Sequence, residues 1–132
     1  AGYTLCNDYA IRDYLENYYR PNLRVKNRHS TTPVGPYIVD TATIPSPNNL
    51  TLRTWVNGEL RQEGTTADMI FDVPFLIEYI SSFMTLQAGD MIATGTPEGL
   101  SDVVAGDEVI VEIEGIGRLR NYIVSETEFF KN

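Results

Sequence analysis

The sequence predicts a mainly β protein of the α+β class, a β-roll or sandwich with one amphipathic helix and a short helical segment near its start. Apolar and polar residues alternate over 50–56 and again over 108–114, as they do in half-buried strands. The pair Asn57-Gly58 ends the first of these runs. Helical periodicity is clear only after Asp72. The length of 132 residues is enough for one domain with its own core.

Composition and charge limit the classes of protein to which this chain can belong. The chain is 42% hydrophobic and 21% charged, which is ordinary for a soluble globular protein. Its net charge of −8 argues against a nucleic-acid or anionic-membrane partner. It has no apolar run long enough to cross a membrane. Because Cys6 is the only cysteine, no internal disulfide can form, and a reducing, cytoplasmic compartment is expected.

The first third predicts short elements separated by turns. Residues 3–7 are expected to form a strand and residues 8–19 a helical turn or helix that Pro21 ends, since proline cannot continue a helix. Residues 20–28 are expected to be a loop or extended chain. The turn-rich stretch 29–36 should lead into a short strand over 37–39.

A β-hairpin is expected in the middle of the chain. The strand over 50–56 follows a connector at 45–49 that is too short to divide domains. Asn57-Gly58 suits a type I′ turn because both residues tolerate positive φ angles. Residues 59–62 form the return strand.

One amphipathic helix should begin at Asp72, whose side chain caps it, with Pro74 in its first turn. The helix should end before Gly89. Its apolar residues fall on one stripe, which predicts packing against the core rather than a cofactor site. The stripe comprises Leu76, Ile77, Ile80, Phe83 and Met84.

The last third predicts strands over 90–94, 108–114 and 118–124, with Gly115-Ile116-Gly117 as the turn between the last two. Within the middle strand, Glu112 and Glu114 are two residues apart and could share a hard cation. The alternation places them opposite the apolar residues, so a solvent-exposed face is the expected reading.

Asp8 and Arg12 form the first candidate site. Asp8 follows a predicted strand, and an arginine four residues later would lie on the same face of a helical turn. Asp8 could bind a metal ion while Arg12 orients the carboxylate or meets an anion. The alternative is an ordinary helix start, capped by Asn7 or Asp8.

Two further stretches could bind anions. Four of the ten positive charges fall within 20–28, where there is no acid; the alternative is a solvated basic loop. Residues 94–99 read Thr-Gly-Thr-Pro-Glu-Gly, and their backbone N–H groups could hold a carboxylate, although most such sequences are only turns. His29 is the only histidine, which excludes a histidine-based triad or zinc site built on several histidines within this chain.

These motifs, in this order, resemble the fumarylacetoacetate hydrolase family from Gly2 to about Ser125. The resemblance rests on Asn-Asp-Tyr-Ala-Ile-Arg-Asp at 7–13, Arg-Val-Lys-Asn-Arg at 24–28, Thr-Pro-Val-Gly-Pro at 32–36, the Asn-Gly hairpin, Asp-Met-Ile-Phe at 68–71, Gly-Asp-Met-Ile-Ala-Thr-Gly-Thr-Pro-Glu-Gly at 89–99 and Gly-Asp-Glu-Val-Ile-Val-Glu-Ile-Glu-Gly-Ile-Gly at 106–117.

The resemblance implies a divalent cation, usually Mg²⁺ with Mn²⁺ or Ca²⁺ as alternatives, held by three carboxylates. Asp8 matches the third. The other two form a Glu-x-Glu pair that precedes this region in relatives, so residues 1–132 are expected to be a single partial catalytic domain lacking its N-terminal part. Glu112 and Glu114 match the closing strand of the family and do not replace that pair.

The resemblance also implies roles for other residues. Lys26 matches a lysine near the metal and substrate, and Arg12 matches an arginine that supports the site. Thr96, with Gly95 beside it, matches a contact to a substrate carboxylate. Arg24, with Arg20 and Arg28, is a candidate to bind the distal carboxylate of a dicarboxylate substrate. His29 departs from the acid that many relatives carry.

The implied activity is metal-dependent isomerisation and decarboxylation of 2-oxo or 2-hydroxydienoic dicarboxylates in aromatic catabolism, through a stabilised enolate. A homo-oligomer, most simply a dimer, is expected. Two alternatives remain: hydrolysis of a carbon–carbon bond in an acylpyruvate, and a non-catalytic β module with an incomplete metal site.

Overall fold

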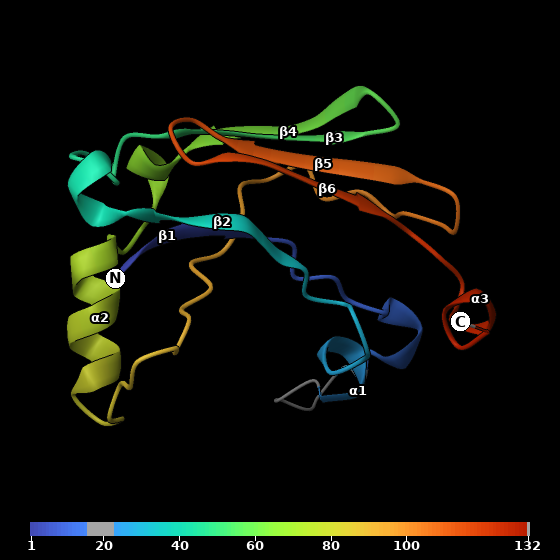
Figure 1. Cartoon of the computed structure of the whole chain (residues 1–132), viewed down its shortest axis with the longest axis horizontal. Coiled ribbons are helices and arrows are strands. Elements are labelled where there is room, and N and C mark those ends of the chain that lie inside the picture. Colours follow the sequence, from blue (N-terminus) through green and yellow to red (C-terminus); the bar gives the residue numbers. More distant parts are fainter. Residues whose placement is uncertain (16–22, 132) are drawn as a thin grey trace.

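Two antiparallel sheets form the framework, which confirms the mainly β prediction (Figure 1). The computed structural model describes residues 1–15 and 23–131. The smaller sheet pairs β1 (Gly2–Cys6) with β2 (Val34–Asp40). The larger sheet has the order β4-β3-β5-β6, with bounds Thr51–Val56 for β3, Glu59–Thr65 for β4, Glu108–Ile113 for β5 and Gly117–Tyr122 for β6.

The core lies between the two sheets. Leu5 of β1, Val111 of β5 and Leu119 of β6 are buried together, and Ile44 and Ile116 close the cluster from the adjoining loops. Leu5 is only 1% exposed. The alternation that predicted β5 therefore places Val111 inside the molecule, where it holds the smaller sheet against the larger one.

The central hairpin is confirmed. Asn57 and Gly58 have φ angles of 50° and 81°, as a type I′ turn requires, and Val56 pairs with Glu59 across it. The return strand is longer than expected and continues to Thr65.

The helical turn or helix predicted over 8–19 is reduced, within 8–15, to a single 3₁₀ turn. Residues 8–11 form no helix or strand, and within 8–15 only the 3₁₀ turn η1 (Arg12–Tyr14) is helical. The backbone N–H groups of Asn7, Tyr9 and Ile11 donate to carbonyls of other segments, so tertiary hydrogen bonds replace those of a helix. The remaining part of that prediction, with Arg20 and Pro21, lies outside the described residues.

Three other boundaries differ from expectation. A short helix, α1 (Leu23–Lys26), occupies part of the predicted loop, and β2 begins at Val34 instead of Tyr37. Residues 90–94 form no strand. The turn that follows, at Thr96 and Pro97, is joined to β4 by hydrogen bonds from the Gln62 side chain.

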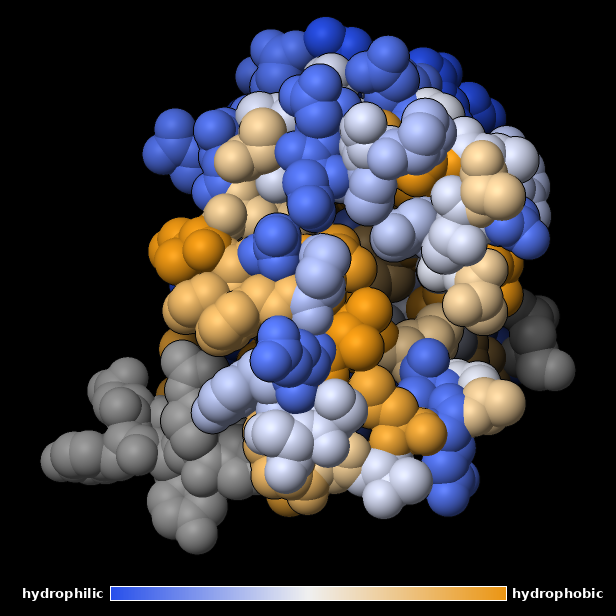
Figure 2. Space-filling model, turned by 90° about the vertical axis from the view of Figure 1, so that its left-hand side faces the viewer, coloured by the Kyte–Doolittle hydropathy of each residue, from blue (hydrophilic) through white to orange (hydrophobic). Residues whose placement is uncertain are grey.

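Helix α2 (Val73–Ser81) begins as predicted but does not pack as predicted. Asp72 Oδ1 accepts a hydrogen bond from Phe75 N at 2.8 Å, which confirms the cap. No residue of α2 is buried, and Ile77 is 46% exposed, so the core-packing prediction is wrong for this chain. Successive aromatic rings contact each other along the exposed helix, and hydrophobic side chains gather on this side of the molecule in Figure 2.

The remaining helical pieces are short. They are η2 (Thr41–Thr43), η3 (Thr66–Asp68) and α3 (Glu126–Phe129), the last with a capping box made by Ser125 and Glu128. Across 1–15 and 23–131, no helix has the length and apolar character needed to span a bilayer.

Candidate active site

An ion pair joins the two residues that the sequence placed closest to the chemistry. Lys26 Nζ lies 2.7 Å from Asp8 Oδ2 and 3.1 Å from the Asp8 backbone oxygen. Asp8 follows β1, and Lys26 ends α1, 18 positions later. The side chains are 40% exposed for Lys26 and 48% for Asp8, so solvent and small ligands can reach the pair.

Backbone hydrogen bonds and one buried side chain fix this pair in place. Tyr9 N donates to Thr31 O at 3.0 Å, and Ile11 N donates to Val25 O at 3.1 Å. Val25 is 2% exposed and anchors α1 to the interior. The segment after β1 is therefore attached to α1 at Ile11 and to the turn that follows α1 at Tyr9.

Asp8 fits a divalent cation as one ligand of a larger set. Magnesium and manganese prefer carboxylate oxygens, which Asp8 supplies. Within the part of the chain that the structure describes, no three His, Cys, Asp or Glu side chains come together as a metal site. The other ligands of such a site would have to come from outside the described residues.

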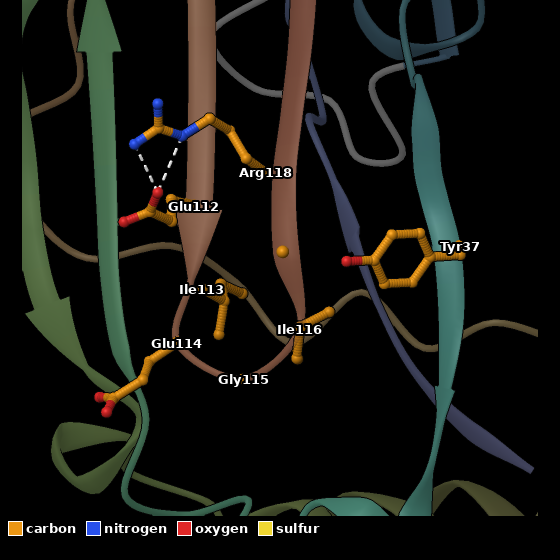
Figure 3. Close-up of a pocket in the computed structure, with 8 residues that line it drawn as sticks. Tyr37, Glu112, Ile113, Glu114, Gly115, Ile116 and Arg118 are labelled. Carbon is orange, nitrogen blue, oxygen red and sulfur yellow. Dashed lines mark hydrogen bonds and ion pairs between the residues drawn. The ribbon is translucent and has the colours of Figure 1, made fainter.

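Glu112 and Glu114 do not form an alternative cation site. Glu112 is paired with Arg118 at 2.6 Å, whereas Glu114 is exposed. Figure 3 shows Glu112 joined to Arg118, with Glu114 lying apart from that pair where β5 enters the turn. The cavity drawn there, about 410 Å³ and bounded by Tyr37 and the β5–β6 turn, includes neither Asp8 nor Lys26 among its lining residues.

Arg12 and Arg24 are placed differently from Lys26. Arg12 is exposed on η1 and makes no ion pair with any described residue. The shared helical face expected with Asp8 is absent because residues 8–11 form no helix. Arg24 stacks over the Tyr14 ring at 4.4 Å. Arg28 covers the same ring at 4.9 Å and also pairs with Glu126 at 3.3 Å. Within the basic segment 20–28, the charge of Arg28 is thus already paired with an acid.

The turn containing Gly95 and Thr96 is attached to β4 by a residue that the sequence did not single out. Gln62 Nε2 donates to Thr96 Oγ1 at 3.0 Å and to Pro97 O at 2.8 Å. Among the described residues, no hydrogen bond links this turn to Asp8 or Lys26. The only sequence signal for Gln62 was a polar side chain within an otherwise regular return strand.

Two groups beside Asp8 stay protonated well above neutral pH. Burial raises the pKa of Tyr9 to about 12, and its hydroxyl accepts a hydrogen bond from Asn7 Nδ2 at 3.2 Å. Partial burial, and secondly the negative charge of Asp8, raise the pKa of the Cys6 thiol. Cys6 is nonetheless an exposed residue.

Replacing Tyr9 by phenylalanine should flatten the loss of stability at alkaline pH. The folded-state pKa lies above the unfolded value near 10, so the neutral hydroxyl stabilises the fold below pH 10, and this stabilisation is lost as the pH rises toward 12. Because Tyr9 is only partly buried, we expect the lost stabilisation to be about 1–2 kcal/mol. Urea unfolding at pH 8 to 11.5 would measure it. Tyr79→Phe, at an exposed site, should behave as wild type, and equal pH slopes for all three proteins would contradict the burial argument.

Comparison with known proteins adds a family model and close relatives. The model "Fumarylacetoacetate (FAA) hydrolase C-terminal" matches residues 1–124. The chain is 75% identical over 126 residues to the 4-hydroxyphenylacetate degradation bifunctional isomerase/decarboxylase of Salmonella dublin. That match covers 96% of this chain and 29% of the relative, so the chain spans under a third of the length of this curated protein.

Solved structures agree with the fold. The 2-hydroxyhepta-2,4-diene-1,7-dioate isomerase of Mycobacterium marinum is 43% identical with a TM-score of 0.84, over 95% of this chain and 48% of that one. Maleylpyruvate hydrolase of Sphingobium, solved with manganese(II) ion and pyruvate, is 40% identical with a TM-score of 0.76, over 80% of this chain and 40% of that one.

Proposed function

The chain belongs to the fumarylacetoacetate hydrolase family, and from this we propose that it takes part in metal-dependent isomerisation and decarboxylation of 2-oxo or 2-hydroxydienoic dicarboxylates in aromatic catabolism. The observation that carries the proposal is the contact between Asp8 and Lys26, the two residues assigned to the metal and the reacting atoms. The 75% identity to an isomerase/decarboxylase supports this choice of reaction.

Asp8 would contribute one carboxylate to a divalent cation, with Mg²⁺ first and Mn²⁺ or Ca²⁺ as alternatives. When bound, such a cation supplies Lewis-acid stabilisation of negative charge on an oxo acid. The Lys26 ammonium, 2.7 Å from Oδ2, holds the Asp8 carboxylate and restricts its rotation. A relative solved with manganese(II) and pyruvate supports both the metal class and the oxo-acid class of ligand.

Lys26 would act on the substrate by charge and by proton transfer. Decarboxylation and double-bond isomerisation both place an electron pair on the C2 oxygen of the oxo acid. An ammonium beside that oxygen stabilises the charge, and the same group can donate or accept the proton that isomerisation moves. Lys26 is 40% exposed, so its Nζ can reach a ligand without unfolding α1.

The remaining roles concern binding. Gly95 and Thr96 would hold a substrate carboxylate through backbone N–H and hydroxyl groups. Arg24 would meet the distal carboxylate if its guanidinium leaves the Tyr14 ring, and Arg12 would support the site electrostatically. A small dicarboxylate is therefore the proposed ligand, with no nucleic-acid or membrane partner.

Hydrolysis of an acylpyruvate is the second candidate reaction, because a maleylpyruvate hydrolase shares the fold. Hydrolysis needs a base to activate water. The ring of the only histidine, His29, packs beside the rings of Phe129 and Phe130, with centroid distances of 6.4 and 5.8 Å. This arrangement favours a packing role. A non-catalytic module is the third reading. For assembly and compartment we propose a homodimer in the cytoplasm.

Calorimetric titration of Mg²⁺ into the full-length protein, followed by assays with an isomerase/decarboxylase substrate and with an acylpyruvate, tests the proposal. We expect one Mg²⁺ per chain and turnover of the first substrate only. Turnover of the acylpyruvate alone would favour hydrolysis. Absence of both binding and turnover would favour the non-catalytic module and contradict the proposal.

A further inference from the structure

We propose that Gln62 is a positioning residue that directs the Thr96 hydroxyl toward a substrate carboxylate. The inference rests on the proposed function, in which Thr96 contacts that carboxylate. It adds a residue from a different strand, β4, and states what this residue does to the hydroxyl group.

Gln62 is a buried amide with both of its N–H bonds used. It is 8% exposed, and Nε2 lies 2.8 Å from Pro97 O and 3.0 Å from Thr96 Oγ1. A buried primary amide is costly unless it is hydrogen-bonded. The turn at 95–99 supplies these partners, so the turn and the amide stabilise each other at the edge of β4.

The partners of Gln62 determine the direction of the hydroxyl proton. A backbone carbonyl can only accept, so the amide nitrogen must face Pro97 O. The second hydrogen on Nε2 then points to Thr96 Oγ1, which acts as acceptor. A hydroxyl that accepts from one side has its own proton available for another partner. Thr96 is exposed, so that partner can be an anion arriving from solvent.

The turn is held against β4 at two other points. A side chain at Gly99, where φ is +95°, would collide with the backbone oxygen of Arg61, and one at Gly64 would lie 2.8 Å from Pro97 Cβ. These close approaches need glycine. Removing the Gln62 amide should therefore change the direction of the Thr96 hydroxyl without detaching the turn.

The anion is assigned as a carboxylate of a small oxo acid. The exposed amides of a glycine-containing turn and a hydroxyl donor complement a carboxylate, and a donor bound to a charged acceptor contributes more than one bound to a neutral group. Orientation of the hydroxyl should therefore affect binding of the ligand more than the turnover of bound ligand.

Pyruvate, titrated with Mg²⁺ present and followed by NMR at the amides of residues 95–99, is the probe. Gln62→Met should bind pyruvate about tenfold more weakly than wild type, and Thr96→Val by a similar factor. The double variant should be no weaker than either single one, because both remove the same hydrogen bond to the ligand. Thr96→Ser, which keeps the hydroxyl, should bind as wild type.

Thr54→Val is the matched control. Thr54 is the other buried polar side chain among the described residues, at 7% exposed, and pairs with Gln62 across the hairpin, yet it makes no hydrogen bond to the turn. It should leave the pyruvate affinity unchanged. Gln62→Glu is a second variant of the same size. Its carboxylate would accept the Thr96 proton and should also weaken pyruvate binding, so the test does not depend on one variant folding.

The outcomes separate this inference from the proposed function. Wild-type affinity in Gln62→Met and Gln62→Glu, alongside weakened Thr96→Val, would overturn the role of Gln62. Absence of any pyruvate-dependent shift at 95–99 in the wild type would overturn it as well. If pyruvate binds with the expected dependence on Gln62 but no oxo-dicarboxylate is turned over, the inference is supported and the proposed function is contradicted.

Discussion

Replacing Lys26 by methionine is expected to lower kcat for isomerisation and decarboxylation by about 10²–10⁴-fold, the usual contribution of a positioned proton donor or acceptor. Methionine keeps the length of the side chain but removes the charge beside Asp8. Because the ion pair is exposed, the free energy of unfolding should change by less than about 1 kcal/mol. Initial rates at saturating substrate, with circular dichroism to verify folding, would measure both effects.

Lys131→Met is the matched control, since Lys26 and Lys131 are the only lysines in the chain. Lys131 is exposed and forms no ion pair with any described residue. The control should retain full activity. A Lys26→Met protein whose kcat stays within about threefold of wild type would remove Lys26 from the chemistry, because proton transfer contributes far more than that.

Asp8→Asn should weaken the affinity for Mg²⁺ and Mn²⁺ by about a hundredfold or more and abolish turnover at ordinary metal concentrations. The amide preserves the shape of the side chain but loses the negative charge that a hard cation requires. The matched control is Asp13→Asn, a nearby acid on η1 that forms no ion pair with described residues. Calorimetric titration of both variants gives the affinities. Equal metal affinity in Asp8→Asn and wild type would exclude Asp8 as a ligand.

Local chemistry explains which elements could be predicted. The hairpin around Asn57-Gly58 and the cap at Asp72 depend on neighbouring residues alone, and both are present. The helix expected over 8–19 depended on context. Its backbone donors at Tyr9 and Ile11 bond instead to Thr31 and Val25, partners that no local pattern identifies.

The stripe on α2 shows a different limit. Periodicity correctly indicated an amphipathic helix, but it cannot say what covers the apolar face. Among the described residues no side chain of the helix is buried, and Ile77 is 46% exposed. The chain matches only 29% of the Salmonella protein, and the described residues do not make the core contacts that the stripe predicted.

The candidate site was predictable only in part. The contact of Asp8 with Lys26 could not be derived from spacing, because it depends on how α1 packs through Val25. The family resemblance supplied that pairing. It did not supply Gln62, since a glutamine in a strand carries no signal until its buried partners, Thr96 and Pro97, are seen.

Paramagnetic broadening by Mn²⁺ tests most directly whether a divalent cation binds beside Asp8 and Lys26. In an NMR titration of the 132-residue chain at substoichiometric Mn²⁺, the amides of residues 7–9 and 25–27 should broaden first and together, because both segments adjoin the same ion pair. Broadening that begins at Glu112 and Glu114 on the β5 side, or that spreads evenly over the acidic surface, would contradict a metal site at Asp8.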